Sequence, residues 1–277
     1  MKPYHDFYPS ESAESTDTLV LLHGWGLNSS VFDALIPELL PHYHVMVIDL
    51  PGMGRSPIHN GDYTLEYLTQ SVQSVVKDLG HFHLLGWSLG GLVALFVANQ
   101  LPSQVLSCAV VATNLSFVQR DQWPGVKAHS FAHFQGLLSE DARGCLVRFL
   151  ALQSKGSKEQ RRLIEYLKER VFLYGLPAPK ALESGLGILS NCDLRDLIGE
   201  LPMPLWFGFG CHDELVPIEL ASALPQRAAL RPTSQIVTFS QSAHLPFVTQ
   251  SADFAMEWRN FLKSVSRLTD EVAECGS

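Results

Sequence analysis

Residues 82–95, FHLLGWSLGGLVAL, place a single serine among glycines within an otherwise apolar run. The first five residues are typical of a short buried strand, and the residues from Gly90 onward are typical of a buried helix. The stretch GWSLG, residues 86–90, is therefore the turn between them and matches the G-x-S-x-G pattern, in which a serine projects above the end of a strand. Gly86 and Gly90 leave room for so tight a turn. A glycine-rich turn that only closes a strand–helix unit is the alternative that this pattern alone leaves open.

A nucleophilic serine needs a base that takes its proton and a third group that orients the base. In a strand–turn–helix site of this kind the chain order is serine, acid, histidine. Asp213 follows a predicted strand in GFGCHDELVP, residues 208–217, and His244 follows the next one in FSQSAHLPF, residues 239–247. Both residues lie at the carboxyl ends of strands, where open α/β sheets hold their sites. The sequence predicts a catalytic triad of Ser88, Asp213 and His244, with Ser88 as the nucleophile.

Other titratable residues compete for these roles. The chain has 11 histidines, and His212 stands beside Asp213. Because His212 precedes the acid and shares its loop, it fits the expected order poorly. Asp49 and Asp193 are further carboxylates near strand ends or in loops. Asp49 precedes the serine and begins a glycine- and proline-rich loop, where a structural hydrogen-bonding role is expected.

Two backbone amides are predicted to bind the oxyanion of the reaction. The helix after Ser88 begins at Leu89, and its first amides point toward the serine hydroxyl. A second donor usually comes from the loop after an earlier strand, which here is LLHGWGLN, residues 21–28. Its glycines let the backbone of Trp25 approach the substrate, so the amides of Trp25 and Leu89 are the predicted donors. A packing role for the Trp25 side chain is compatible with this interpretation.

The chain has 277 residues, of which 46% are hydrophobic and 17% charged, as in a globular protein with one main core. Short runs rich in Val, Leu and Ile alternate with longer runs of helical period, which predicts an α/β fold: a mostly parallel sheet with helices on both faces. Expected strands span residues 18–24, 44–50, 82–86, 105–113, 204–210 and 234–240. Expected core helices span residues 29–40, with a serine cap, 64–79, 90–100 and 253–265.

Residues 114–187 interrupt this rhythm. They contain no convincing strand, only helical segments that carry most of the Lys and Arg residues of the chain. We therefore expect an inserted helical cap at residues 114–187. It separates a first part of the core at 1–113 from a second part at 188–277, which ends in a polar tail from about residue 265.

The net charge of −8 argues against a broad nucleic-acid-binding surface, although a local basic patch can still serve an acidic partner. Five scattered cysteines without a CxxC pair indicate reduced thiols rather than a metal or redox site. The N-terminus lacks the apolar region of a secretion signal, and no run of about 18 apolar residues is present to cross a membrane. We expect a cytoplasmic monomer that binds neither nucleic acid nor membranes.

Five motifs frame nearly the whole predicted core: HGWG, DLPGMGRS, GWSLGG, HDELVP and AHLPF. Together they resemble the motifs of the alpha/beta hydrolase family, which implies the fold of that family. A more specific resemblance is to the biotin-synthesis carboxylesterases that hydrolyse the methyl ester of pimeloyl-acyl carrier protein. It rests on LLHGWGLNSSVF, LLGWSLGGLVA, DELVP and two cap segments, DQWPGVK from Asp121 and RFLALQSKG from Arg148.

This resemblance implies a substrate, a pocket and a docking surface. The substrate would be pimeloyl-acyl carrier protein methyl ester, hydrolysed without metal or cofactor. The acyl pocket would be lined by Trp25, Ser88, Leu89, Phe149, Leu150, Ala151, Leu152, Gln153 and His244. Basic residues of the cap would meet the acidic carrier: Arg148 and Arg161 stand where the pattern expects arginine, and Arg143, Lys158 and Arg162 lie nearby, whereas Glu165 and Gly144 depart from the pattern.

Three alternatives remain at this point. The basic residues are also compatible with solvated charges on helix surfaces. A general short-chain carboxylesterase or thioesterase would share the triad without carrier specificity. A non-catalytic member of the fold would bind a small ligand without turnover, a reading that the intact triad disfavours.

Overall fold

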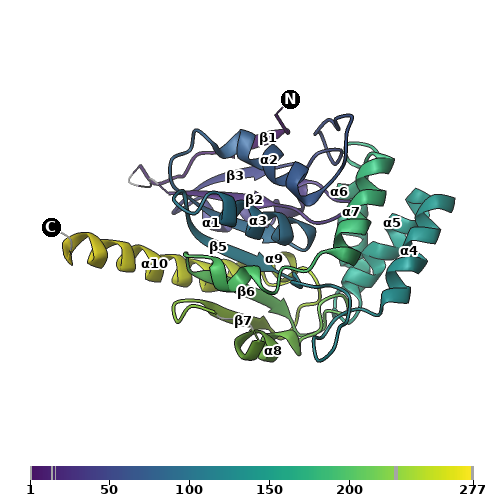
Figure 1. The fold of residues 1–277 in the computed structure, drawn as a ribbon. Helices are drawn as coiled ribbons and strands as arrows, with labels where there is room; N and C mark the ends of the chain where they lie inside the picture. The colour runs from purple at the N-terminus through teal and green to yellow at the C-terminus, as the bar shows by residue number, and fades with distance from the viewer. Residues whose placement is uncertain (1, 14, 16, 228–229, 276–277) are drawn as a thin grey trace.

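A seven-stranded sheet forms the centre of the computed structural model, which describes residues 2–13, 15, 17–227 and 230–275. The strand order is β1-β3-β2-β4-β5-β6-β7, and every neighbouring pair is parallel except β1–β3, which is antiparallel (Figure 1). The strands are β1 (His5–Tyr8), β2 (Thr18–Leu22), β3 (His44–Ile48), β4 (Phe82–Trp87), β5 (Val105–Val111), β6 (Leu205–Gly210) and β7 (Gln235–Phe239). The predicted mostly parallel α/β sheet is confirmed.

The central strands are apolar and buried along their whole length, as expected for parallel strands covered on both faces. All residues of β2, β4 and β6 are buried. Helix α3 packs on β2, β4 and β5 and against α2, while α10 contacts α1, α9, β5 and β7. These helices are α1 (Ile36–Leu39), α2 (Leu65–Val76), α3 (Leu89–Gln100), α9 (Pro246–Thr249) and α10 (Ser251–Cys275).

Four helices lie together beside the sheet rather than against its centre (Figure 1). They are α4 (Ala128–Glu140), α5 (Ala142–Ser154), α6 (Gln160–Phe172) and α7 (Pro179–Asn191), and α5 packs on both α4 and α6 while α7 packs on α4. The chain enters this group after β5 and leaves it before β6. Between residues 114 and 127 the structure holds two isolated bridges, Val118–Val126 and Arg120–Trp123.

The prediction of one continuous helix with a serine cap at residues 29–40 is wrong in both respects. The segment divides into a 3-10 turn, η1 (Ser29–Phe32), and the short α1, which has a proline in its first turn. Proline is tolerated there but lacks the amide that a continuous helix requires. The cap of η1 is Asn28, whose side chain accepts a hydrogen bond from the Ser30 amide at 3.1 Å, so a serine is not the cap.

Four other elements differ from the sequence-based expectation. The antiparallel edge strand β1 was not predicted, nor was α8 (Leu220–Arg227), which contains Pro225. Helix α10 was expected to end near residue 265 but runs to Cys275, so the segment predicted as a polar tail continues the helix. A second 3-10 turn, η2 (Leu197–Glu200), precedes β6. Within the described ranges, no helix is long and apolar enough to span a membrane.

Candidate active site

Ser88 occupies a strained turn between β4 and α3. Its backbone has φ 55° and ψ −116°, in the region that L-residues rarely adopt. A Cβ atom added to Gly86 would lie 2.2 Å from the carbonyl oxygen of Gly90, and one added to Gly90 would lie 2.4 Å from that of Leu22. Both flanking glycines are therefore required by the turn itself.

Strand β5 anchors this turn. The Ser88 amide donates to the Val111 carbonyl at 2.9 Å, and the Thr113 hydroxyl donates to the Ser88 carbonyl at 3.1 Å. Gly91 allows this approach, because a Cβ there would lie 2.0 Å from Thr113 Oγ1. Backbone strain at one residue persists only where neighbouring contacts hold it in place, and these bonds provide that support.

Asp213 and His244 form a buried pair. His244 Nδ1 lies 2.7 Å from Asp213 Oδ2, and the other carboxylate oxygen, Oδ1, accepts the amides of Leu215 at 2.8 Å and Val216 at 3.0 Å. The His244 side chain is fully buried. The carboxylate holds the imidazole proton on Nδ1, which leaves the lone pair on Nε2 available to act as a base.

Trp87 connects the serine turn to the histidine loop. Its indole Nε1–H donates to the His244 carbonyl at 2.8 Å, and the two ring centroids lie 5.5 Å apart. The His244 amide in turn donates to the Gln153 carbonyl at 3.2 Å. His244 Nε2 is buried and bonds to no atom of the described residues, so no direct hydrogen bond joins it to Ser88 in this structure. Catalytic hydrogen bonds are often formed only when substrate is bound.

The loop that contains Trp25 packs against Ser88. A Cβ on Gly24 would lie 3.2 Å from Ser88 Cβ and 2.9 Å from the Trp87 ring. The Trp25 side chain is buried, donates from Nε1 to the Leu182 carbonyl at 2.8 Å, and meets Phe149 with ring centroids 4.7 Å apart. The side chain packs on the helices beside the sheet, and the backbone of its loop lies beside the serine.

His23 holds this loop in place and was not singled out by the sequence. Its Nδ1–H donates to the Gly24 carbonyl at 2.8 Å, and its Nε2 accepts the Leu50 amide at 2.9 Å. Because an acceptor role at Nε2 requires a neutral ring, both contacts agree with burial, which lowers the pKa of His23. The sequence signal that could have identified His23 is its position next to Gly24 at the end of a buried strand.

The other residues considered for the acid and the base, Asp49, Asp193 and His212, make different contacts. Asp49 accepts from the Ser29 amide at 2.7 Å and from the Arg55 amide and Nε at 2.9 and 3.1 Å, as expected for a structural hydrogen-bonding role. Asp193 pairs with Arg195 at 2.7 Å and is partly exposed. The backbone of His212 bonds to Ser242.

The run predicted for the acyl pocket divides between the interior and a surface hollow. Phe149, Leu150 and Gln153 are buried, and both polar atoms of the Gln153 amide lack a partner among the described residues. Ala151 and Leu152 line a hollow of about 640 Å³ between α4 and α5. A buried amide without partners is costly, which sets Gln153 apart from the other residues of this run.

The five predicted carrier contacts differ in their surroundings. Arg148 is exposed and lines the hollow between α4 and α5. On α6, Arg161 pairs with Glu165 at 3.7 Å and Arg162 with Glu159 at 3.3 Å.

Arg143 and Lys158, the other two predicted contacts, form no ion pair with a carboxylate of the residues that the structure describes. The Arg143 guanidinium lies 4.0 Å from the centroid of the Phe172 ring. Lys158 lines another hollow, of about 520 Å³, with Arg161 and with Lys168, a further basic residue of α6.

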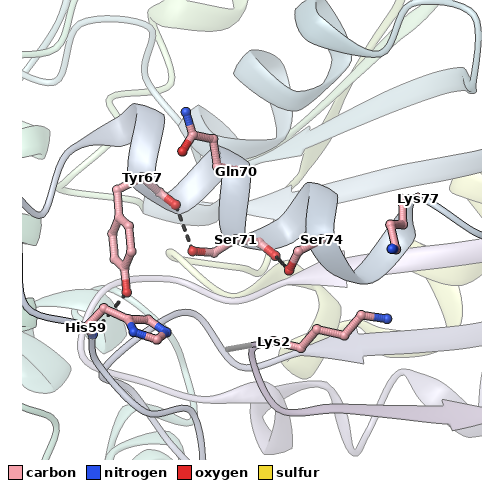
Figure 2. A pocket seen from close by; sticks show the side chains of 7 residues that line it. All are labelled: Lys2, His59, Tyr67, Gln70, Ser71, Ser74 and Lys77. Carbon is pink, nitrogen blue, oxygen red and sulfur yellow. Dashed lines mark hydrogen bonds between the residues drawn. The ribbon is translucent and has the colours of Figure 1, made fainter.

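Another hollow, of about 450 Å³, lies along α2 and contains none of the predicted site residues. Figure 2 shows Tyr67, Gln70, Ser71 and Ser74 along the helix, with Lys2 and His59 facing them. In the part of the chain that the structure describes, no three His, Cys, Asp or Glu side chains cluster in a way that could hold a metal ion.

The fold and the site define a class of protein, a hydrolase built on a mostly parallel α/β sheet. Residues 19–257 match the alpha/beta hydrolase family, and the chain belongs to that family. It is 40% identical over 250 residues to the pimeloyl-[acyl-carrier protein] methyl ester esterase of Klebsiella pneumoniae subsp. pneumoniae, covering 90% of this chain and 95% of the relative. The esterase of the same name from Aeromonas salmonicida is 39% identical over 247 residues, covering 88% of this chain and 94% of the relative.

Solved structures share the fold at lower identity. An esterase from Exiguobacterium antarcticum superimposes with a TM-score of 0.80 at 22% identity, covering 94% of this chain and 95% of that one. MenH from S. aureus superimposes with a TM-score of 0.75 at 20% identity, covering 96% of this chain and all of the other. At this level of identity the likeness concerns the fold alone.

Proposed function

We propose that this protein is a serine carboxylesterase that hydrolyses the methyl ester of pimeloyl-acyl carrier protein to pimeloyl-acyl carrier protein and methanol, a step of biotin synthesis. The single observation that carries the chemistry is the buried Asp213–His244 pair at 2.7 Å, held by Trp87 beside the strained turn of Ser88. The substrate is supported by relatives of that name, about 40% identical over almost their whole length.

The mechanism follows from the arrangement of these groups. His244 Nε2 takes the Ser88 proton while Oγ attacks the ester carbonyl, and Asp213 stabilises the resulting imidazolium. The amides of Trp25 and Leu89 bind the oxyanion of the tetrahedral intermediate. The carbon–oxygen bond to the methoxy group breaks, and His244 gives that oxygen a proton, releasing methanol. A water molecule then attacks the acyl-serine by the same route, which frees the pimeloyl group and restores Ser88.

The helices between β5 and β6 supply the substrate-facing residues in this proposal. We assign residues 114–187 as a cap over the carboxyl edge of the sheet. Its run from Phe149 to Gln153 contributes the wall of the acyl pocket, together with Trp25, Ser88, Leu89 and His244. None of these steps uses a metal or cofactor. The monomeric state and the cytoplasmic location stay predictions from the sequence.

Complementation tests the proposed function in a cell. The gene is expressed in a strain that lacks the methyl esterase and is grown in biotin-free medium, beside Ser88→Ala and His212→Gln variants. We expect growth with the wild type and with His212→Gln, and none with Ser88→Ala. Lack of growth with a well-expressed wild type would reject the assigned substrate, and growth with Ser88→Ala would reject the assigned nucleophile.

A general short-chain esterase is the second candidate, because carboxylates and an aromatic ring occupy several of the predicted carrier contacts. Arg161, Arg162 and Arg143 each have such a partner within the chain. The double variant Arg148→Glu, Arg161→Glu separates the two functions. A carrier-specific enzyme loses activity on the carrier-bound ester relative to a nitrophenyl ester, whereas a general esterase keeps the ratio of the two activities.

A further inference from the structure

The carboxyl-terminal end of α5 contacts the backbone of the candidate base. We call residues 153–156 the α5 end segment. Gln153 lies in the last turn of the helix, where carbonyls have no amide partner within the helix, and its carbonyl accepts the His244 amide at 3.2 Å. The His244 carbonyl accepts the indole Nε1–H of Trp87. The backbone of His244 is therefore held from two sides, by the end of β4 and by the end of α5.

The α5 end segment also contacts the two residues that flank Asp213 in the chain. Lys155 Nζ forms an ion pair with the Glu214 carboxylate at 2.8 Å. Gly156 packs closely on His212, because a Cβ added to this glycine would lie 2.9 Å from His212 Cβ. The acid and the base thus lie on loops that both rest on the same four residues of the chain.

The two loops are also joined to each other. The His212 amide donates to the Ser242 carbonyl at 3.0 Å, and the Asp213 carboxylate lies 2.7 Å from His244 Nδ1. A displacement of the α5 end segment is therefore transmitted to the acid and the base together. Because a proton transfer requires close alignment of its groups, a shift of about 1 Å can cost up to about 10²-fold in rate.

Two glycines separate the effect of backbone conformation from the effect of this contact. Gly156 has φ 84° and Gly175 has φ 87°, both in the left-handed region that favours glycine. A Cβ on Gly156 would meet the first side-chain atom of His212, which cannot move aside without its backbone. A Cβ on Gly175 would meet no atom within 4 Å. The two positions share a conformation and differ in what they contact.

We propose that the α5 end segment positions the catalytic acid and base, so that ester hydrolysis depends on how α5 is seated against their loops. The inference rests on the proposed function, because it takes Asp213 and His244 as the acid and the base of an esterase. The backbone carbonyl of Gln153 acts on His244, and this role is separate from the place of its side chain in the acyl pocket. Lys155 and Gly156 act on the loop of the acid.

The variants Gly156→Ala and Gly175→Ala test the segment as a matched pair. Each forces an alanine into the left-handed region, so both should unfold at a lower urea concentration than the wild type. We expect kcat per folded protein on a short nitrophenyl ester to fall about tenfold in Gly156→Ala, with KM little changed. In Gly175→Ala we expect the wild-type kcat, because nothing presses on the acid loop.

The ion pair gives a second test that does not strain the backbone. Both side chains are partly exposed, so Lys155→Gln and Glu214→Gln should fold normally and each lower kcat about threefold, the size of an exposed ion pair. A direct effect of the two charges on His244 would instead change kcat in opposite directions. The double variant Lys155→Glu, Glu214→Lys exchanges the charges, and we expect it to recover most of the lost kcat.

Each result supports or overturns the positioning role. Wild-type kcat in Gly156→Ala would overturn it, as would an equal loss in Gly175→Ala. If Gly156→Ala does not fold, the ion-pair variants decide, and opposite changes or wild-type kcat in both single variants would overturn it. Absence of ester hydrolysis by the wild type would instead reject the proposed function on which the inference rests.

Discussion

The indole Nε1–H of Trp87 donates a 2.8 Å hydrogen bond to the carbonyl oxygen of His244. The residue immediately before the candidate nucleophile thus positions the backbone of the candidate base. Because Trp87 ends β4 and His244 follows β7, the bond joins the end of one strand to the loop after another, and these two strands are not neighbours in the sheet.

Replacing Trp87 by Phe removes this bond while keeping an aromatic ring. We expect kcat on an activated ester to fall about five- to thirtyfold, the equivalent of one lost buried hydrogen bond, with KM little changed. Trp206→Phe is the matched control, since the buried Trp206 Nε1 has no partner among the described atoms. A Trp87→Phe enzyme as active as Trp206→Phe would show that the bond does not position the base.

Replacing Asp213 by Asn keeps the shape of the acid but removes its charge. The amide no longer stabilises the imidazolium or fixes the proton on Nδ1, so we expect kcat to fall by about 10⁴. Asp193→Asn alters a partly exposed carboxylate paired with Arg195 and serves as the comparison. Steady-state ester hydrolysis measures both variants. A larger loss in Asp193→Asn would transfer the role of the acid to that residue.

Gly90, the last residue of the nucleophile turn, gives a prediction on stability. Gly90→Ala would place its Cβ 2.4 Å from the Leu22 carbonyl oxygen, so we expect unfolding at a lower denaturant concentration or failure to fold. Gly187→Ala, in α7, meets no atom within 4 Å and should stabilise by up to about 1 kcal/mol. Urea unfolding of a stable Gly90→Ala protein at the wild-type midpoint would contradict the tight packing of the turn.

The buried His83 makes stability depend on pH. Burial lowers the pKa of His83 to about 4, and its Nδ1 contacts Ser107 Oγ at 2.8 Å. The unfolded chain binds the proton more readily than the folded chain does. The stability associated with neutral His83 is therefore fully present above about pH 6.5, and it is lost as the pH falls toward 4. The free energy of unfolding falls by about 3 kcal/mol over this pH range.

His83→Gln removes this titration and leaves the other acid-sensitive groups unchanged. We expect its free energy of unfolding to fall less than that of the wild type between pH 7.5 and pH 4, by urea titration at each pH. Parallel pH dependence in the two proteins would exclude His83 as a source of acid sensitivity.

The parallel strands could be predicted from local patterns in the sequence. Each parallel strand from β2 to β7 is a short, mainly apolar run. The predicted order of serine, acid and histidine comes from the residues that follow β4, β6 and β7. The edge strand β1 escaped prediction because its half-exposed residues take their strand form from pairing with β3, about forty residues away. Helix α8 escaped because Pro225 conceals a helical period.

The residues that support the site were harder to predict than those proposed to react. His23 and Trp87 act through contacts with Leu50 and His244, which only the folded sheet brings near. The end of α5 likewise contacts the loop of the acid, which is distant from it in the sequence. Motifs predict a reacting group from neighbouring residues, whereas a supporting contact depends on long-range packing.

Methanol release from purified pimeloyl-acyl carrier protein methyl ester shows whether Ser88 hydrolyses this ester. The assay follows the loss of one methyl group from the carrier-bound acyl chain by mass spectrometry, with wild-type protein and with Ser88→Ala. We predict rapid conversion by the wild type and conversion at least about 10⁴-fold slower by the variant. No conversion by folded wild-type protein, or equal conversion by Ser88→Ala, would contradict this prediction.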